Sequence, residues 1–181
     1  MTRTILTYGL ISGVVIILGM IGTIVFDLGN HHTSVWLGYL IMLVGLSSIL
    51  MGIRQYRDRQ LGGVIKFTTA FGVGLGIAVV ASLAYVAIWE VYMALTHYTF
   101  MDSYVSGTLA AKRAAGVTGA AYAKAAAEME AMRVQYANPL YRMPMTFVEI
   151  FPVGLIVALA SAALLRNPRF LPARSRATVA A

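Results

Sequence analysis

Carboxylates and imidazoles stand near the ends of the apolar segments of this chain. The acidic members close or open an apolar run, and the histidines lie beside them. These residues are Asp27, His31, His32, Glu90, His97 and Glu149. Such groups can relay protons, hold a polar ligand or bind a metal ion. No His-x-x-x-His or Glu-x-x-His spacing occurs in the sequence, so it predicts no metal site.

Glu149 has the strongest claim to a functional role among these residues. Counting about 20 residues back from Leu165 places it about one turn inside the hydrocarbon, where a carboxylate is costly. Counting up from Lys66, whose aliphatic stem can reach the interface, places Glu90 at the interface, and Asp27 is also interfacial. Two interpretations of Glu149 stay open. It is either part of a proton or ion relay or polar ligand pocket, or a structural group that caps its helix or pairs with Arg142.

Four apolar runs must position these groups. The uncharged runs are Thr4 to Phe26, Ser34 to Ile53, Phe67 to Trp89 and Ile150 to Leu165. A hydrocarbon core about 30 Å thick needs about 20 apolar residues as helix. The chain is 59% hydrophobic and only 12% charged, which is far from a soluble composition. We predict an all-α polytopic membrane protein, one membrane domain over residues 1–181, with four transmembrane helices at about 4–27, 34–54, 66–95 and 145–165.

The connection between the third and fourth runs contains two Ala-rich segments. They flank the break GVTG, where Thr118 is the expected N-cap of the second segment. A stripe of residues at helical spacing in that segment comprises Tyr122, Ala125, Met129, Met132 and Tyr136. We predict an extramembrane helical hairpin at about 101–137 between helices 3 and 4, ended by Asn138-Pro139. This hairpin is either a solvated lid on the bundle end or the lipid surface, or a surface that binds a partner.

Lysine and arginine are distributed unevenly between the connections. The connection after the first run has none, whereas the next one has Arg54, Arg57, Arg59 and Lys66, and the tail 166–181 has four arginines. Basic connections face the cytoplasm, so both termini and the basic tail are predicted to be cytoplasmic. The net charge of +7 therefore reflects membrane topology, and we expect the lipid bilayer, and no nucleic acid, as a partner.

The basic connection carries the motif GIRQYRD at 52–58, followed by Gly62-Gly63 and Lys66. This motif resembles the signature of the DUF4199 family of bacterial membrane proteins, and the segment MTFVEIFPVGLIVALASAALLR resembles the closing helix of that family, including Glu149 and Gly154. The resemblance covers nearly the whole chain. It implies four spans in the bacterial cytoplasmic (inner) membrane and supplies no activity.

The residues of this cytoplasmic motif that we single out are Arg54, Tyr56, Arg57 and Asp58. We expect the arginines to anchor the connection at lipid headgroups, or alternatively to contact a cytoplasmic partner. Asp58 is available for a local ion pair, and Gly62-Gly63 is expected to form the turn into the third span.

The sequence contains no nucleophile–base pair and no cysteine, so it predicts no enzyme and no cofactor. The first interpretation is a non-enzymatic structural or accessory membrane protein that binds a second copy of itself or another membrane protein. The alternative is a small oligomeric transporter, or a proton or ion relay, that uses Glu149 and Glu90 beside a helix kink at Pro152. The two interpretations differ in whether these carboxylates face a common polar cavity or pair with an arginine.

Overall fold

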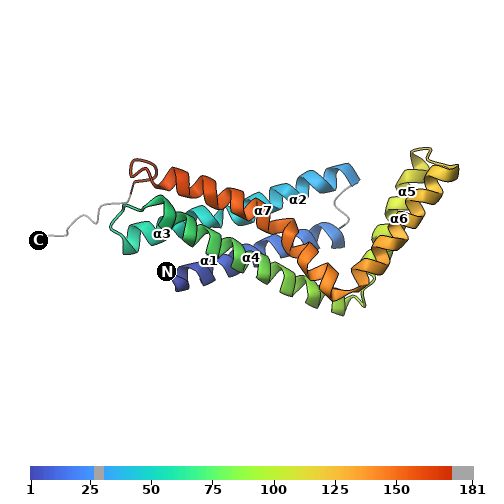
Figure 1. Ribbon diagram of the computed structural model, residues 1–181, viewed down its shortest axis with the longest axis horizontal. Helices are drawn as coiled ribbons and strands as arrows, with labels where there is room; N and C mark the ends of the chain where they lie inside the picture. The colour runs from blue at the N-terminus through green and yellow to red at the C-terminus, as the bar shows by residue number, and fades with distance from the viewer. Residues whose placement is uncertain (27–30, 173–181) are drawn as a thin grey trace, which may run out of the picture. The chain divides into compact units, whose positions relative to one another are not determined.

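The computed structural model describes the backbone of residues 1–26 and 31–172, and the side chains of these residues except 31–35. Within this part of the chain there are seven helices and no strand, so the predicted all-α fold is confirmed. The helices are α1 (Thr2–Val25), α2 (His31–Leu46), α3 (Ser48–Gln60), α4 (Phe67–Leu95), α5 (Phe100–Ala114), α6 (Gly119–Ala137) and α7 (Pro139–Leu165) (Figure 1).

Four helical segments of the described residues are long and apolar enough to span a membrane. They are Thr2–Val25, Trp36–Gln60, Phe67–Leu95 and Pro139–Leu165. The second segment joins α2 to α3 through Ser47. Each segment is about 36 Å or longer at about 1.5 Å per residue, which exceeds the hydrocarbon thickness of about 30 Å. The chain is therefore an integral membrane protein with four candidate spans.

The helix of the fourth span begins at Pro139, earlier than the start expected near residue 145. Asn138 has extended backbone, and its side-chain oxygen accepts a hydrogen bond from the Leu140 N–H at 3.0 Å. It therefore caps α7, and Pro139 occupies the first helical position, where the missing N–H costs nothing. Asn138 alone separates α6 from α7, which continues as one helix through Pro152.

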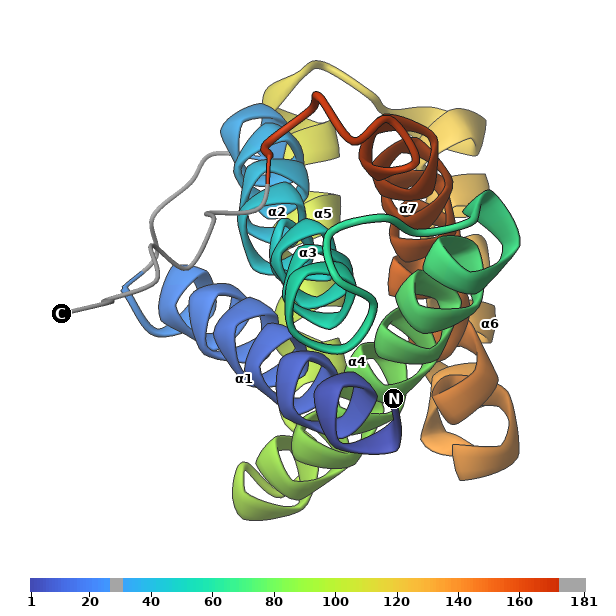
Figure 2. The same ribbon diagram turned by 90° about the vertical axis from the view of Figure 1, so that its left-hand side faces the viewer.

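Contacts within the chain divide it into two compact units. The first comprises Met1–Tyr85 and Glu149–Ala181, and the second comprises Val86–Val148. In the first unit α1 contacts both α2 and α3 (Figure 2). The helices α4 and α7 contribute one segment to each unit, so the second unit holds the end of α4, all of α5 and α6, and the start of α7.

Small residues allow the helices of the first unit to approach closely. A Cβ atom added at Gly13 would lie 2.7 Å from the carbonyl oxygen of Ala81 and 2.7 Å from the Cβ of Ala84. A Cβ atom at Gly154 would lie 2.9 Å from the Cβ of Ala78. Because lipid tails remove any hydrophobic drive between helices, such close backbone packing is a main source of association. Gly13 and Gly154 therefore act in helix packing.

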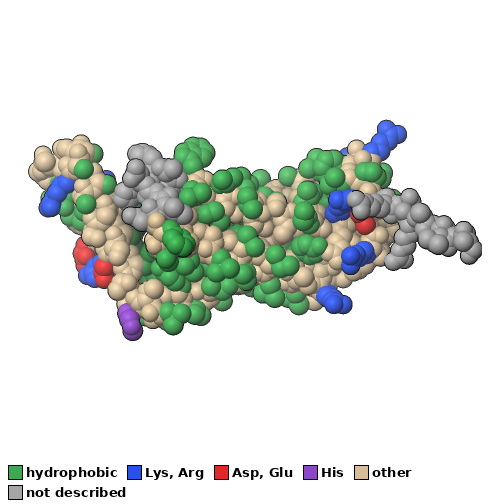
Figure 3. Space-filling view, turned by 180° about the vertical axis from the view of Figure 1, so that it is seen from behind, with side chains coloured by type: hydrophobic (Ala, Val, Ile, Leu, Met, Phe, Trp, Pro, Cys, Tyr) green, Lys and Arg blue, Asp and Glu red, His purple; other side chains and the backbone are tan. Residues whose placement is uncertain are grey.

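Basic side chains of the first unit gather where α3 ends and α4 begins, whereas hydrophobic side chains cover the helices between the ends (Figure 3). The N-terminal ammonium lies at this end too, because it donates to the side chain of Gln60 at 3.3 Å. The chain turns there through Gly62 (φ +66°) and Gly63 (φ +97°), as expected for the connection into the third span. Both values are unfavourable for residues with a Cβ.

The second unit contains the α5–α6 hairpin, whose helices pack against each other. The α6 residues of the predicted stripe are buried or half-buried, as are Met101, Val105, Thr108 and Leu109 of α5. The stripe therefore lies on the side of α6 that packs against α5. The Arg113 guanidinium covers the ring of Tyr122 at 4.6 Å. Thr118 is the N-cap residue of α6, without a side-chain hydrogen bond.

Candidate functional site

The second unit contains a buried ion pair between Arg142 of α7 and Glu90 of α4. The Arg142 Nε donates to Glu90 Oε1 at 2.7 Å, and its Nη2 donates to Oε2 at 2.5 Å. Arg142 is 1% exposed, and the Glu90 side chain is 18% exposed. Two parallel charge-assisted hydrogen bonds are the strongest arrangement available to this pair of groups. Both carboxylate oxygens of Glu90 are thereby engaged.

Arg142 also joins the end of α6 to this pair. Its Nη1 donates to the carbonyl oxygen of Tyr136 at 3.0 Å and to that of Ala137 at 3.5 Å. These carbonyls stand in the last turn of α6, where helical backbone oxygens lack partners within the helix. The guanidinium therefore connects α4, α6 and α7 through charged hydrogen bonds.

Aromatic side chains surround the same guanidinium. The ring centroids of Tyr98 and Tyr136 lie 5.3 Å and 5.8 Å from the Arg142 Cζ, within the range of cation–π attraction. The Tyr136 hydroxyl accepts a hydrogen bond from the Trp89 Nε1 at 2.9 Å. Trp89 in turn meets the ring of Phe100 edge-on at 4.9 Å. We refer to Trp89, Glu90, Tyr98, Tyr136 and Arg142 as the Arg142 cluster.

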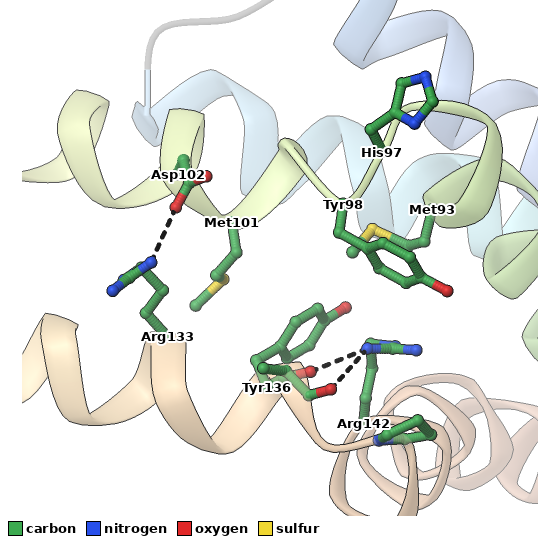
Figure 4. A pocket seen from close by; sticks show the side chains of 10 residues that line it. Met93, His97, Tyr98, Met101, Asp102, Arg133, Tyr136 and Arg142 are labelled. Atoms are coloured by element: carbon green, nitrogen blue, oxygen red, sulfur yellow. Dashed lines mark hydrogen bonds and ion pairs between the residues drawn. The ribbon is translucent and has the colours of Figure 1, made fainter.

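The connection between α4 and α5 adopts a strained conformation beside this cluster. His97 and Tyr98 have φ values of +52° and +59°, a left-handed region that costs residues with a Cβ about 1–2 kcal/mol each. The Tyr98 N–H donates to the Met93 carbonyl oxygen at 2.8 Å. The contact of the Tyr98 ring with Arg142 offsets part of this strain. The imidazole of His97 is exposed and points away from Met93 and Tyr98 (Figure 4).

A pocket of about 400 Å³ opens between the two sides of the hairpin base (Figure 4). One side is formed by the end of α4 and the start of α5, and the other by the end of α6 and the start of α7. The lining residues are Met93, His97, Tyr98, Met101, Asp102, Arg133, Tyr136, Ala137, Pro139 and Arg142. The pocket thus combines thioether and aromatic walls with two arginines and one carboxylate.

An exposed ion pair borders this pocket. The Arg133 Nη1 lies 3.4 Å from Asp102 Oδ1, while its Nε and Nη2 donate to Glu130 at 2.9 Å and 2.7 Å. The hydrogen bond from Arg133 lowers the pKa of the Glu130 carboxyl, and the same contact raises the pKa of Arg133. Both groups are therefore charged at neutral pH. The contact of Asp102 with Arg133 is longer than the two contacts of Glu130 with Arg133.

Glu149 lies exposed on α7, and the described residues provide its carboxylate with no hydrogen bond or ion pair. The ion pair with Arg142, one of the alternatives considered for Glu149, is not formed, because Arg142 binds Glu90. Glu90 belongs to the second unit and Glu149 to the first. Asp27 lies outside the described residues, as do the side chains of His31 and His32. No group of three or more metal-binding His, Cys, Asp or Glu side chains occurs in the described part of the chain.

The motif at 52–58 contains a second buried arginine. Arg57 is 0% exposed, and its Nε donates to Asp58 Oδ1 at 2.7 Å. Its Nη1 donates to the Phe170 carbonyl oxygen at 3.0 Å, and its Nη2 donates to that of Leu171. Arg57 therefore ties the segment after α7 to α3. This corrects its expected place at lipid headgroups, since a fully buried guanidinium does not reach them.

The polar residues Arg54, Tyr56 and Asp58 of the motif lie nearer the surface than Arg57. Arg54 Nε is 3.5 Å from Asp58 Oδ2, so Asp58 makes the expected local ion pair and also binds Arg57. Tyr56 is half-buried. The N–H groups of Leu61 and Gly63 both donate to the Arg57 carbonyl oxygen at 3.1 Å, which closes the end of α3. Arg54 is half-buried, and a headgroup contact for it stays a prediction.

Sequence reasoning missed the roles of Arg142, Tyr98 and Trp89. The sequence does contain a signal for the ion pair, namely the number of residues between each charged side chain and the far end of its span. Glu90 lies 23 residues after Phe67, and Arg142 lies 23 residues before Leu165. Two helices of about 1.5 Å rise per residue therefore place both side chains about 35 Å from the other end of their spans. Opposite charges at matched depth on successive spans predict an ion pair.

The family comparison covers most of the chain. A family model described as "Protein of unknown function (DUF4199)" matches residues 7–167. Comparisons with curated proteins and with solved structures found no match. The matched range includes the motif at 52–58, the Arg142 cluster and the greater part of all four spans. The chain therefore belongs to the DUF4199 family, whose function is unknown.

Proposed function

We propose that this protein is a non-enzymatic accessory membrane protein and that the α5–α6 hairpin is its partner-binding element. The observation that supports this role is the Arg142 cluster, in which one guanidinium binds Glu90 and the end of α6. The cluster fixes the base of the hairpin to the helix ends of its own unit. A preorganised element loses less conformational entropy when it binds, which favours affinity for a partner.

The engagement of Glu90 favours a structural role over a relay. A relay carboxylate must be free to exchange its partner during each cycle. Both carboxylate oxygens of Glu90 accept hydrogen bonds from the buried Arg142, at 2.7 Å and 2.5 Å. This arrangement supports a structural anchor better than a relay.

The outer surface of the hairpin is suited to helix packing. The outward positions of α6 include alanines at helical spacing, beside exposed charged residues such as Lys124 and Glu128. Exposed alanines of α6 include Ala120, Ala123, Ala127 and Ala131. Small side chains let a second helix approach closely. The partner class that this surface fits is a helix of a second copy or of another membrane protein.

Site-specific photo-crosslinking tests this role. A photoreactive residue at Ala127 should give a discrete protein adduct in native membranes, and Arg142→Met should reduce that adduct several-fold because the hairpin is no longer held at its base. A photoreactive residue at Leu18, 61% exposed on the apolar helix α1, is the matched control and should react with lipid. The proposal fails if Ala123 and Ala127 both give no protein adduct in membranes where the chain is folded.

We further propose that both termini face the cytoplasm of a bacterial inner membrane and that the hairpin lies on the opposite side. The basic end of the first unit supports this orientation, since cytoplasmic connections are enriched in lysine and arginine. The chain has no cysteine, so single-cysteine variants can be labelled cleanly. Lys124→Cys should react with a membrane-impermeant reagent applied outside, and Arg59→Cys only after permeabilisation. The opposite pattern would reverse the orientation.

A proton or ion relay is the second candidate function, favoured by the unpaired Glu149 on a spanning helix. An ionisable side chain inside a span is costly and is often functional. Under the accessory role, liposomes containing the wild type should show the same proton flux as liposomes containing Glu149→Gln and as empty ones. A wild-type flux that Glu149→Gln abolishes would replace the accessory role with the relay.

A further inference from the structure

We propose that the pocket at the hairpin base binds the headgroup of a phospholipid whose phosphate carries a primary ammonium, as in phosphatidylethanolamine. The site lies wholly within the second unit, between the start of α5 and the end of α6. Its volume of about 400 Å³ falls within the range of small-molecule sites. This inference is independent of the partner-binding role of the outer hairpin surface.

The depth of the pocket supports a lipid ligand. Helix α4 has 29 residues and is therefore about 43 Å long, whereas the hydrocarbon core is about 30 Å thick. Met93, on the pocket wall, lies 26 residues after Phe67, or about 39 Å along the helix. If Phe67 marks one hydrocarbon boundary and the helix has the usual tilt of about 20°, Met93 stands about 7 Å beyond the other boundary. That is the layer occupied by phospholipid headgroups.

The charges at the pocket favour a zwitterion over a simple anion. Asp102 and Arg133 form a loose pair at 3.4 Å, and their side chains are 65% and 46% exposed. Glu130 engages the Nε and one Nη2 N–H of Arg133 and leaves N–H groups on Nη1 and Nη2 for a ligand. An ammonium at Asp102 and a phosphate at these N–H groups would place each ligand charge beside its opposite. Arg142 offers little further anion-binding capacity, because Glu90 and two carbonyl groups occupy it. A ligand with only negative charge would also be repelled by Asp102.

The pocket walls and the hydrogen-bonding groups also favour one type of headgroup over another. Met93 and Met101 are buried, and with the rings of Tyr98 and Tyr136 they provide apolar contact for the methylene groups of the ligand (Figure 4). A primary ammonium has three N–H donors for the Asp102 carboxylate, whereas a trimethylammonium has none. The site is therefore expected to prefer ethanolamine over choline headgroups.

Native mass spectrometry can test the site with the full chain in detergent. The protein is incubated with equal amounts of phosphatidylethanolamine, phosphatidylcholine and phosphatidylglycerol of one acyl composition. We expect one retained phosphatidylethanolamine on the wild type and at least about tenfold weaker retention on Asp102→Asn, which corresponds to the loss of one charge-assisted hydrogen bond. Glu128→Gln is the matched control, because its carboxylate pairs with Lys124 outside the pocket, and it should retain the lipid like the wild type.

Fluorescence provides a second readout at the pocket wall. The chain has two tryptophans, so Trp36→Phe leaves Trp89, which donates to the pocket residue Tyr136. Its emission should shift on addition of phosphatidylethanolamine and not of phosphatidylcholine. Equal retention by wild type and Asp102→Asn, or preference for phosphatidylglycerol, overturns the proposal. Soluble phosphoethanolamine that binds as tightly as the lipid would assign the pocket to a soluble ligand and likewise overturn it.

Discussion

Replacement of Arg142 by methionine should lower the free energy of unfolding by about 3–5 kcal/mol, the usual cost of breaking a buried ion pair. Methionine keeps much of the aliphatic volume but leaves Glu90 without its counter-charge and the Tyr136 carbonyl oxygen without its donor. Reversible unfolding in bicelles or mixed micelles measures this loss. Glu90→Gln should be milder, because its amide oxygen still accepts from the guanidinium.

A double-mutant cycle isolates the interaction between these two residues. The variant Arg142→Met with Glu90→Met should lose less stability than the sum of the two single methionine variants, because neither charge remains unpaired. We expect a coupling energy of at least about 1.5 kcal/mol, as measured for close charge pairs elsewhere. Additive effects within about 0.5 kcal/mol would show that the pair contributes nothing specific.

The second large effect is expected at Arg57. Arg57→Met removes the donors to Phe170 and Leu171 and leaves Asp58 with the longer contact to Arg54. Each hydrogen bond from a charged donor contributes about 1.5–3 kcal/mol, so the loss should be about 3 kcal/mol or more. The segment after α7 should then be released from α3. Arg59→Met, at an exposed position of the same helix, should change stability by no more than about 0.5 kcal/mol.

Limited trypsin digestion measures that release directly. Arg166 and Arg169 are cleavage sites within the segment that Arg57 holds. Cleavage after these residues should be at least about tenfold faster in Arg57→Met than in the wild type, because proteolysis follows the population of the open segment. Equal rates in Arg57→Met, Arg59→Met and the wild type would show that Arg57 does not hold the segment.

The four spans were predictable because a bilayer imposes length and composition on a helix. No charge interrupts the runs that became α1 and the main part of α4, so their type and approximate ends follow from sequence alone. The start of α7 was less predictable. Apolar counting begins near residue 145, whereas the cap at Asn138 and the proline at the first helical position set the actual start.

The hairpin shows a different limit of sequence reasoning. The periodicity of Tyr122, Ala125 and Met129 identified the buried face of α6, but it cannot name the surface that buries this face. The neighbouring helix α5 supplies that surface. A stripe of residues at helical spacing indicates only that another surface buries it. A short connection such as GVTG favours the preceding helix as that surface.

Buried arginines were the least predictable part of the candidate site. Arg57 and Arg142 stand near span ends, where the usual expectation is a headgroup contact. Arg57 instead binds carbonyl groups more than one hundred residues away in sequence, and Arg142 binds Glu90 across 52 positions. Such partners depend on tertiary packing. Of these partners, only Glu90 could have been predicted from sequence, from its matched depth with Arg142.

The most direct test of the account is whether the Arg142 cluster holds the hairpin. Spin labels at Val91→Cys on α4 and Lys124→Cys on α6 report one distance within the second unit, and pulsed electron resonance gives its distribution. We predict a single narrow distribution in the otherwise wild-type chain and a markedly broader one with Arg142→Met. Equally narrow distributions with and without Arg142, or a broad distribution in the wild type, would contradict the central claim that this cluster fixes the hairpin.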